Sequence, residues 1–430
     1  MLTPAENALL TRTGPGTEMG QYLRRFWQPV LLATELPAPD CPPVRVKLLG
    51  EALIAFRASD GQLGLIDEFC PHRRASLFYG RNEQCGLRCA YHGWQFDVNG
   101  RCMDMPSEPA EFGFKERVYT KAYPAREWGG LIWAYLGSAY QRPALPEFDW
   151  AVVPAGHRYV SKRLQESNYL QAVEGGIDSS HVSFLHSTPA AETHISSTLG
   201  LQSAYMWRDK APRFTVNRTD YGLLIGARRD AEPDTYYWRI TQFLLPTATI
   251  IPGAIGGEAP FNGHFWTPID DERCWNYSIS WLPGRPLTAA EIADLQSGAS
   301  IHAGVDQQTY LPLRNKRNEY LLDRAAQHTT SFSGLSGVSE QDAAVQEGMG
   351  PIVDRSLEHL GTSDTAIIAA RRLLLKECRA LQAGHEPPAT QKPYAYRVRS
   401  ASLLLKRDVS YEETVTDALV RPVTPAGAAS

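Results

Sequence analysis

The chain has 430 residues, of which 43% are hydrophobic and 21% charged, and its formal net charge is -4. This length exceeds what one hydrophobic core usually serves, so we expect two domains or one small and one large domain. The charge gives no reason to expect nucleic acid or an anionic membrane as partner. No segment approaches the roughly 18 apolar residues of a membrane span, and no signal-like N-terminus is present, so we expect a soluble, cytoplasmic protein.

The N-terminal third is predicted to be a helical lead-in followed by a β-domain. A capping-like TPAE at residues 3–6 and an aromatic, basic stretch favour a short helix within the first 40 residues. From Val44 the chain reads as short strands separated by Gly and Asp-Gly turns, which predicts an antiparallel β-domain over residues 41–141. The Pro-rich segment 142–148 has the composition of a linker.

Two mixed pairs of cysteine and histidine lie inside the predicted β-domain. Cys70 and His72 form C-x-H, and Cys89 and His92 form C-x2-H. Two loops that each offer one thiolate and one imidazole suit a Rieske [2Fe-2S] centre, in which two cysteines hold one iron and two histidines the other. A Cys2His2 zinc site has the same ligands, but structural zinc motifs usually place like ligands together. We therefore predict a Rieske cluster.

The segment from Asn168 to His186 carries a second group of metal-ligating side chains, with Asp178, His181 and His186 at the spacing D-x2-H-x4-H. Two imidazoles and a carboxylate that leave open positions hold non-haem Fe(II) for reactions with O2. On a helix His186 falls about 140° from His181, so both can reach one ion only across a break, which we expect near residues 183–185. The alternative is a buried helix with two satisfied histidines.

The remaining chain is predicted to complete an α+β fold. Alternating stretches from Arg213 to Leu282, with Gly, Pro and Asp turns between them, favour a curved antiparallel sheet. Residues 363–381 are predicted to form an amphipathic helix with Ser363 as N-cap. The predicted parts are a lead-in (1–40), a Rieske domain (41–141), a mononuclear iron domain (142–383), and an extended arm with a loose tail (384–430).

Two histidines need a carboxylate to complete an iron site, and the downstream candidates are Asp306, Asp323, Asp342 and Asp354. A Ser- and Gly-rich loop precedes Asp342 and places it in the first turn of a predicted helix. Ser339, three residues earlier, allows a different interpretation, in which this aspartate belongs to a capping box.

Together these motifs resemble one known family. The resemblance is carried by C-P-H-R at 70–73, C-x-x-H-G-W at 89–94 and E-G-x-x-D-x-x-H-x4-H at 174–186. These are similar to the oxygenase (alpha) component of Rieske non-haem iron ring-hydroxylating oxygenases, and the order of the parts resembles the phthalate dioxygenase branch, which needs no β subunit. The resemblance implies a helix-grip catalytic domain, and its Q-D-x-x-x-x-E pattern places the third iron ligand at Asp342, with Asp354 as the next candidate.

The resemblance also implies how the two metals communicate. The aspartate that matches Asp178 links a Rieske histidine of one subunit, here His92, to an iron ligand of the next, here His181. This happens within a head-to-tail ring of three, so we expect a homotrimer or a trimer of trimers. A carboxylate between two metal-bound imidazoles orients both rings. The alternative is a buried Asp178 that only fixes the tautomer of one histidine.

The implied reaction is hydroxylation of a small aromatic substrate with O2. Electrons come from NADH through a separate flavin- and ferredoxin-type reductase, and the chain has no G-x-G-x-x-G or P-loop of its own. The product is a cis-dihydrodiol, or a phenol where an O-methyl group is removed. Competing functions are a Rieske O-demethylase or monooxygenase of methoxylated aromatic acids, a Rieske electron-transfer module without oxygenase activity, and a zinc-dependent hydrolase.

A carboxylated substrate needs a buried cation, preferably the planar fork of arginine. Arg208, after the predicted iron helix, and Arg239, in an apolar strand, are the predicted substrate-binding residues. A salt bridge to a neighbouring carboxylate is an equally good account of Arg239. The adjacent Arg228 and Arg229 are expected to be solvated.

Overall fold

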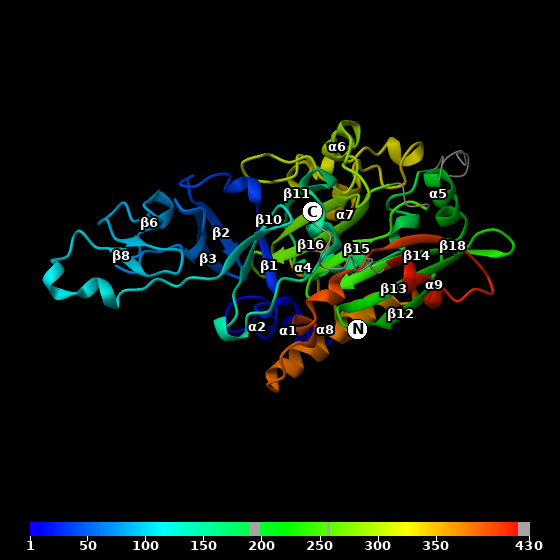
Figure 1. Ribbon diagram of the computed structural model, residues 1–430. Coiled ribbons are helices and arrows are strands. Elements are labelled where there is room, and N and C mark those ends of the chain that lie inside the picture. The colour runs from blue at the N-terminus through cyan, green and yellow to red at the C-terminus, as the bar shows by residue number, and fades with distance from the viewer. Residues whose placement is uncertain (189–197, 256–258, 420–430) are drawn as a thin grey trace, which may run out of the picture. The chain divides into compact units, whose positions relative to one another are not determined.

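The computed structural model describes residues 1–188, 198–255 and 259–419 (Figure 1). Their contacts divide the chain into two compact units. The larger unit contains Met1–Thr11, Ala144–Trp266 and Glu272–Ser430, and the smaller unit contains Arg12–Pro143 and Thr267–Asp271. Each unit has its own sheets and is described by itself.

The smaller unit consists of three small antiparallel sheets, which confirms the predicted N-terminal β-domain. The first contains β1 (Trp27–Leu32), β10 (Leu131–Tyr135) and β9 (Ala125–Trp128), and the second contains β2 (Val44–Leu48), β3 (Glu51–Arg57) and β4 (Leu63–Asp67). The third contains β5 (Arg81–Glu83), β6 (Gly86–Arg88), β7 (Gln95–Phe96) and β8 (Cys102–Asp104). A buried core that includes Ile54, Phe56 and Phe96 also contains Cys70 and Cys89, so the fold places both thiols away from water.

The N-terminal stretch that we expected to be one short helix is divided. Helices α1 (Pro4–Thr11) and α2 (Glu18–Leu23) are helical as expected, but the apolar residues that follow form β1. This strand pairs antiparallel with β10, about 100 residues later in the chain. The helical prediction was wrong here because it considered local propensity, whereas a distant strand supplies the hydrogen-bond partners.

The larger unit is built on an eight-stranded antiparallel sheet in the described part of the chain. Its order is β11 (Arg158–Gln165), β17 (Cys274–Trp281), β16 (Phe261–Pro268), β15 (Ala248–Ile251), β14 (Thr235–Leu244), β13 (Gly222–Asp230) and β12 (Arg213–Arg218), with β18 (Ala401–Lys406) also paired to β14. The predicted sheet over residues 213–282 is confirmed, as is the α+β class. One edge of β14 pairs with β13 from Tyr236 to Leu244, and the other edge is shared by β15 and β18.

Helices of the larger unit lie between and after the strands of this sheet in the chain (Figure 1). The main ones are α4 (Tyr169–Ile177), α5 (Thr198–Arg208), α6 (Ala289–Gln296), α7 (Val338–Gly348) and α8 (Thr365–Gln382), with the short α3 at Asp149–Val152. Helix α8 packs against β12, β13, α1 and α4, and buries Leu374, Leu375 and Cys378. A 3-10 turn precedes α8, so its N-cap is Asp364 and not Ser363. Among these described helices none is long and apolar enough to cross a membrane.

The residues after α8 differ from the predicted extended arm and loose tail. Strand β18 pairs antiparallel with Thr235–Ile240 of β14, and α9 (Tyr411–Leu419) follows it. The ring of Tyr411 stacks on Trp238 of β14 with 4.3 Å between centroids. A short apolar run such as ASLLLK has no partner in the local sequence, so only the free edge of β14 decides that it is a strand. Residues 420–430 lie outside the described residues.

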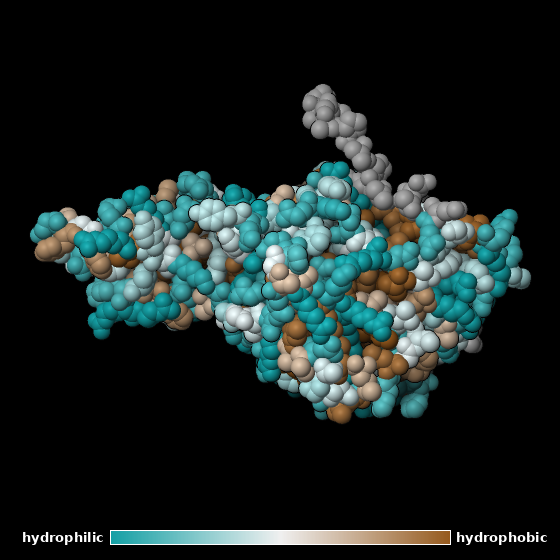
Figure 2. Space-filling model, turned by 90° about the horizontal axis from the view of Figure 1, so that it is seen from below, coloured by the Kyte–Doolittle hydropathy of each residue, from teal (hydrophilic) through white to brown (hydrophobic). Residues whose placement is uncertain are grey.

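The surface carries mainly polar side chains, with apolar side chains in scattered patches on the face that Figure 2 shows. The smaller unit exposes several aromatic side chains, including Tyr79, Tyr91, Phe112 and Tyr119. Exposed aromatic side chains of this size are common where proteins contact a partner.

Candidate active site

The first set of predicted ligands lies in two loops of the smaller unit. One loop follows β4 and carries Cys70 and His72, and the other connects β6 to β7 and carries Cys89 and His92. The two imidazole rings are 4.4 Å apart between centroids, and His72 stacks on Trp94 at the same distance. The thiols are only 1% and 3% exposed. The fold therefore brings the two loops together, with the two imidazoles adjacent and the two thiols buried.

The donor atoms of these loops fit a shared cluster. Nδ1 of His72 is buried and has no hydrogen-bond partner among the described residues, which costs free energy unless the nitrogen binds something else. A hydrogen bond from Cys70 lowers the pKa of Cys89 to about 5, so one thiol of the pair is poised to be a thiolate ligand. At Gly93, where φ is +78°, a Cβ would lie 2.7 Å from Pro106 Cγ. The second loop therefore needs glycine at this turn.

The second set of ligands begins where α4 ends. The helix stops at Ile177, and Asp178 is its C-cap with extended backbone angles. The Asp178 carboxylate accepts a hydrogen bond from the Ser180 amide at 2.6 Å, a local turn that competes with helix. His181 then starts a separate 3-10 turn. The helix therefore ends before His181, and the backbone is irregular again at Phe184, where the 3-10 turn ends, as predicted for residues 183–185.

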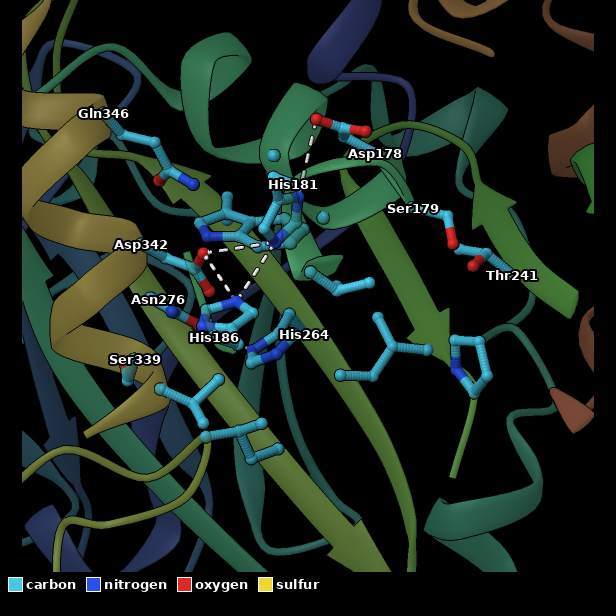
Figure 3. A pocket seen from close by; sticks show the side chains of 18 of the residues that line it. Asp178, Ser179, His181, His186, Thr241, His264, Asn276, Ser339, Asp342 and Gln346 are labelled. Carbon is cyan, nitrogen blue, oxygen red and sulfur yellow. Dashed lines mark hydrogen bonds and ion pairs between the residues drawn. The ribbon is translucent and has the colours of Figure 1, made fainter. Parts of the chain in front are cut away.

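His181, His186 and Asp342 converge on one point (Figure 3). Their ligand atoms all lie within 4.8 Å of one another. The two Nε2 atoms are 3.1 Å apart, and Asp342 Oδ1 lies 3.5 Å from Nε2 of His181 and 3.3 Å from that of His186. Helix α7 begins at Val338 with Gly337 as N-cap, so Asp342 lies in the second helical turn and not in the first. The capping-box interpretation of Asp342 is therefore wrong.

Hydrogen bonds determine which nitrogen of each histidine is free. Gln341 donates from Nε2 to the Leu335 carbonyl at 2.8 Å, so its Oε1 must accept from Nδ1 of His186 at 2.6 Å. Nδ1 of His181 faces the Asp178 carboxylate at 3.5 Å. In the neutral form of each imidazole this leaves Nε2 without a proton, so that the two lone pairs point at each other and at a carboxylate. Such an arrangement is repulsive unless a proton or a metal cation lies among the three groups, and the donor set fits one metal ion of the Fe(II) type.

The electrostatics of the triad support a charged carboxylate. Burial raises the pKa of Asp342, but the neighbouring His186 and His181 outweigh burial and hold that pKa below its ordinary value. The pKa of Asp178 is likewise below its ordinary value, because His181 outweighs the effect of burial. Both aspartates therefore remain anionic at neutral pH.

A cavity of about 130 Å³ opens beside the triad. Its polar lining includes Ser179, Thr241, Asn276, His264 and Arg239 (Figure 3 labels the first four). Burial lowers the pKa of His264 to about 4, so this imidazole is neutral at physiological pH. Arg239 is only 9% exposed, and its Nε has no hydrogen-bond partner among the described residues. The cavity thus combines an iron-type triad with a buried guanidinium whose Nε has no partner among the described residues.

The other predicted substrate residue, Arg208, is placed elsewhere. Its side chain is 50% exposed, it lies 3.7 Å from Glu232, and it does not line the described wall of this cavity. The structure therefore brings Arg239, but not Arg208, to the triad.

Arg229 is a residue that sequence reasoning interpreted wrongly. It is not solvated but fully buried, and it donates to the Ser179 carbonyl at 2.5 Å and to the Ser183 hydroxyl at 3.3 Å. Burial lowers its pKa to about 10. It holds both ends of the turn that carries His181. The signal was present in the sequence, because Ile225, Ala227 and Arg229 alternate along one buried face of β13.

Comparison with known proteins agrees with this geometry. Residues 26–124 match the Rieske [2Fe-2S] domain family, and residues 134–414 match the family described as LigXa C-terminal domain like. The chain belongs to the Rieske oxygenases. As a Rieske oxygenase component it carries a Rieske [2Fe-2S] cluster and a mononuclear iron, which confirms the predicted cofactors. The predicted oxygenase is confirmed over the electron-transfer module and the zinc hydrolase.

Curated relatives extend over nearly the whole of this Rieske oxygenase component. It is 40% identical over 426 residues to the phthalate 4,5-dioxygenase oxygenase subunit of Pseudomonas putida, covering 96% of this chain and 94% of the relative. It is 36% identical to the 3-chlorobenzoate-3,4-dioxygenase oxygenase subunit of Comamonas testosteroni, covering 96% and 97%. It is 32% identical to the 5,5'-dehydrodivanillate O-demethylase oxygenase subunit of Sphingobium sp., covering 90% and 83%.

Solved structures show the same fold at lower identity. Dicamba monooxygenase bound to dicamba superposes with a TM-score of 0.58 at 18% identity, covering 85% of this chain and all of that chain. NdmA of Pseudomonas putida CBB5 gives a TM-score of 0.58 at 19% identity, covering 92% and all of that chain. These neighbours support the predicted order of a Rieske domain followed by a sheet-based catalytic domain.

Proposed function

We propose that this Rieske oxygenase component hydroxylates an aromatic carboxylate with O2. The observation that carries the proposal is Arg239, a buried guanidinium that has no carboxylate partner among the described residues and faces the cavity beside the triad. A buried cation is costly unless an anion neutralises it, and a planar guanidinium can bind a carboxylate through two hydrogen bonds. The substrate itself is the best partner for this charge.

The remaining functions, electron transfer and O2 activation, are assigned to two separate groups of residues. In this proposal Cys70, His72, Cys89 and His92 hold the cluster, and His181, His186 and Asp342 hold the iron. When bound, the cluster supplies one-electron transfer and the iron supplies O2 activation. Gln341 orients His186 by accepting a hydrogen bond from its Nδ1. The neutral His264, Ser179 and Thr241 line the space in which the ring of the substrate lies.

Asp178 is proposed to connect the two sites across a subunit contact. Its Oδ2 faces Nδ1 of His181 at 3.5 Å, and its side chain is still 23% exposed, which leaves room for a second imidazole. The candidate is the partner subunit's His92. In the smaller unit His92 lies against Tyr91, at 3.8 Å between ring centroids, and Tyr91 is 56% exposed. We therefore propose a homotrimer, served by a separate NADH-dependent flavin and ferredoxin-type reductase.

The proposed product is a cis-dihydrodiol, and O-demethylation is the second candidate. Two of the relatives above are named as dioxygenase subunits for phthalate and 3-chlorobenzoate, and a third as an O-demethylase subunit. All three names contain a compound with an aromatic ring. Turnover of phthalate, benzoate and 4-methoxybenzoate separates the two reactions, because only demethylation releases formaldehyde.

The substitution Arg239→Gln tests the anchor. We expect kcat/KM for the carboxylated substrate to fall by about 10- to 100-fold, because charge-assisted hydrogen bonds are lost. Arg208→Gln is the matched control and is expected to leave kcat/KM unchanged, since Arg208 is exposed and paired with Glu232. An unchanged affinity for every carboxylate in Arg239→Gln would contradict the proposal.

A further inference from the structure

Gln346 projects an amide towards the triad without an assigned role. It lies on α7 one helical turn after Asp342, is only 5% exposed, and lines the same cavity (Figure 3). A side-chain amide has two chemically opposite ends, a donor nitrogen and an acceptor oxygen. What Gln346 can bind in the cavity therefore depends on which end faces it.

A relay of two side chains determines that orientation. Arg163 on β11 can only donate, and its Nη2 donates to Oε1 of Gln165 at 3.0 Å. The Gln165 amide is thereby turned so that its Nε2 donates to Oε1 of Gln346 at 2.7 Å. All three side chains are at least 95% buried, so water does not compete for these bonds. Because Oε1 of Gln346 accepts the hydrogen bond from Gln165, its Nε2 is the end of the amide that faces the cavity.

Gly175 on α4 makes room for that nitrogen. A Cβ added at Gly175 would lie 2.2 Å from Nε2 of Gln346, so the amide occupies the space that any other residue would fill. Gly175 is three residues before Asp178, at the end of the helix that leads to His181. Among the described residues Nε2 of Gln346 has no acceptor. This nitrogen belongs to the lining of the cavity, so a ligand there can accept a hydrogen bond from it.

We propose that Gln346 is a hydrogen-bond donor to a small ligand held at the open position of the metal in the triad. The ligand is of the class with a lone pair on oxygen or nitrogen next to the metal-bound atom, such as dioxygen, nitric oxide or azide. Arg163 and Gln165 act as positioning residues that hold the donor end of Gln346 in place. This inference rests on the iron site of the proposed function, but not on the identity of the substrate.

Azide binding to the Fe(II)-loaded protein without substrate tests the donor. We expect the azide dissociation constant to rise about tenfold in Gln346→Met, which has similar length and no donor. Gln165→Glu is the sharper variant, because it touches neither the metal nor the cavity. A glutamate there can pair with Arg163 but cannot donate, so Gln346 turns its nitrogen to Glu and its oxygen to the cavity. Azide affinity is expected to fall at least as far as in Gln346→Met.

Ser167→Ala is the control, because the Ser167 hydroxyl contacts Gln165 Nε2 at 3.1 Å but lies outside the relay to Gln346. It is expected to bind azide like the wild type. Iron content, measured for every variant, shows whether the site is intact. A wild-type protein that holds no mononuclear iron would contradict the iron site itself. Iron-loaded Gln346→Met and Gln165→Glu that bind azide as wild type does would overturn the donor assignment, as would weaker benzoate binding with azide binding unchanged.

Discussion

The two metal sites of this Rieske oxygenase component are assembled in opposite ways. The four side chains proposed for the cluster lie between residues 70 and 92, in two loops from two neighbouring small sheets, and the two imidazole rings are 4.4 Å apart. The triad instead takes His181 and His186 from a broken turn after α4, and Asp342 from α7, more than 150 residues later. One site is local in sequence, and the other exists only when the larger unit is folded.

This difference predicts where each site is fragile. The loops of the smaller unit depend on short hairpins and on Gly93, whereas the triad depends on groups that aim its ligands, such as Gln341 and Arg229. Substitutions in the larger unit should therefore affect the mononuclear iron and leave the cluster intact. The following experiments separate the two sites, from the largest expected effect to the smallest.

Replacing Asp342 by asparagine is expected to remove the mononuclear iron and reduce turnover to background. The triad loses its only anion, whereas the visible absorption of the cluster stays, because its proposed ligands belong to the other unit. Iron content and the visible spectrum measure both sites in one sample. Asp354→Asn is the control: Asp354 is an exposed side chain that accepts hydrogen bonds from Ser356, and iron should be retained. Retention of iron in Asp342→Asn would show that another group completes the site.

Asp178→Asn is expected to keep both metals but lower turnover by about 10- to 100-fold. The carboxylate orients His181 from a distance of 3.5 Å, and an amide presents either a weaker acceptor or a competing donor. A single-turnover measurement of how fast the prereduced cluster is reoxidised in the presence of substrate and O2 locates the defect. If turnover falls only in proportion to lost iron, Asp178 supports the metal site and does not connect it to the cluster.

Gln341→Leu is expected to weaken Fe(II) binding by about tenfold, because His186 loses the acceptor that fixes its tautomer. Competition with a chelator measures the dissociation constant. In the control Ser333→Ala, Gln341 keeps its bond to the Leu335 carbonyl, so the affinity should stay near that of the wild type. Equal affinities in Gln341→Leu and wild type would show that His186 needs no orienting partner.

Arg229→Met is expected to lower the free energy of unfolding of the larger unit by about 2 kcal/mol, because the buried Ser179 carbonyl loses its donor. Arg228→Met provides the comparison. Arg228 lies over the Tyr236 ring at 4.2 Å from its centroid and should contribute less than 1 kcal/mol, an order-of-magnitude figure for such contacts. Denaturant unfolding followed by circular dichroism measures both. Equal shifts in the two variants would contradict the role of Arg229 in holding the turn.

Much of the candidate site could be predicted because most of its metal-ligating residues lie close together in the sequence, at spacings typical of metal sites. The sequence alone shows the mixed C-x-H and C-x2-H pairs and the two histidines five residues apart. The irregular backbone near residues 183–185 was predicted, but the earlier end of α4 at Asp178 could not be predicted in this way. Asp178 ends α4 because its carboxylate binds the Ser180 amide, a competition between side chain and backbone that helical periodicity does not reveal.

The sequence by itself determined the residue types and spacings of both proposed metal sites, the order of the two β-rich parts, and the family. Only the tertiary structure decided that Arg239 and not Arg208 faces the triad, that Arg229 is buried, and that residues 401–406 join the sheet as β18. It also decided which end of Gln346 points into the cavity. The reason is physical: ligand spacing is a property of neighbouring residues, whereas burial, strand pairing and amide orientation depend on partners that the fold brings from distant parts of the chain.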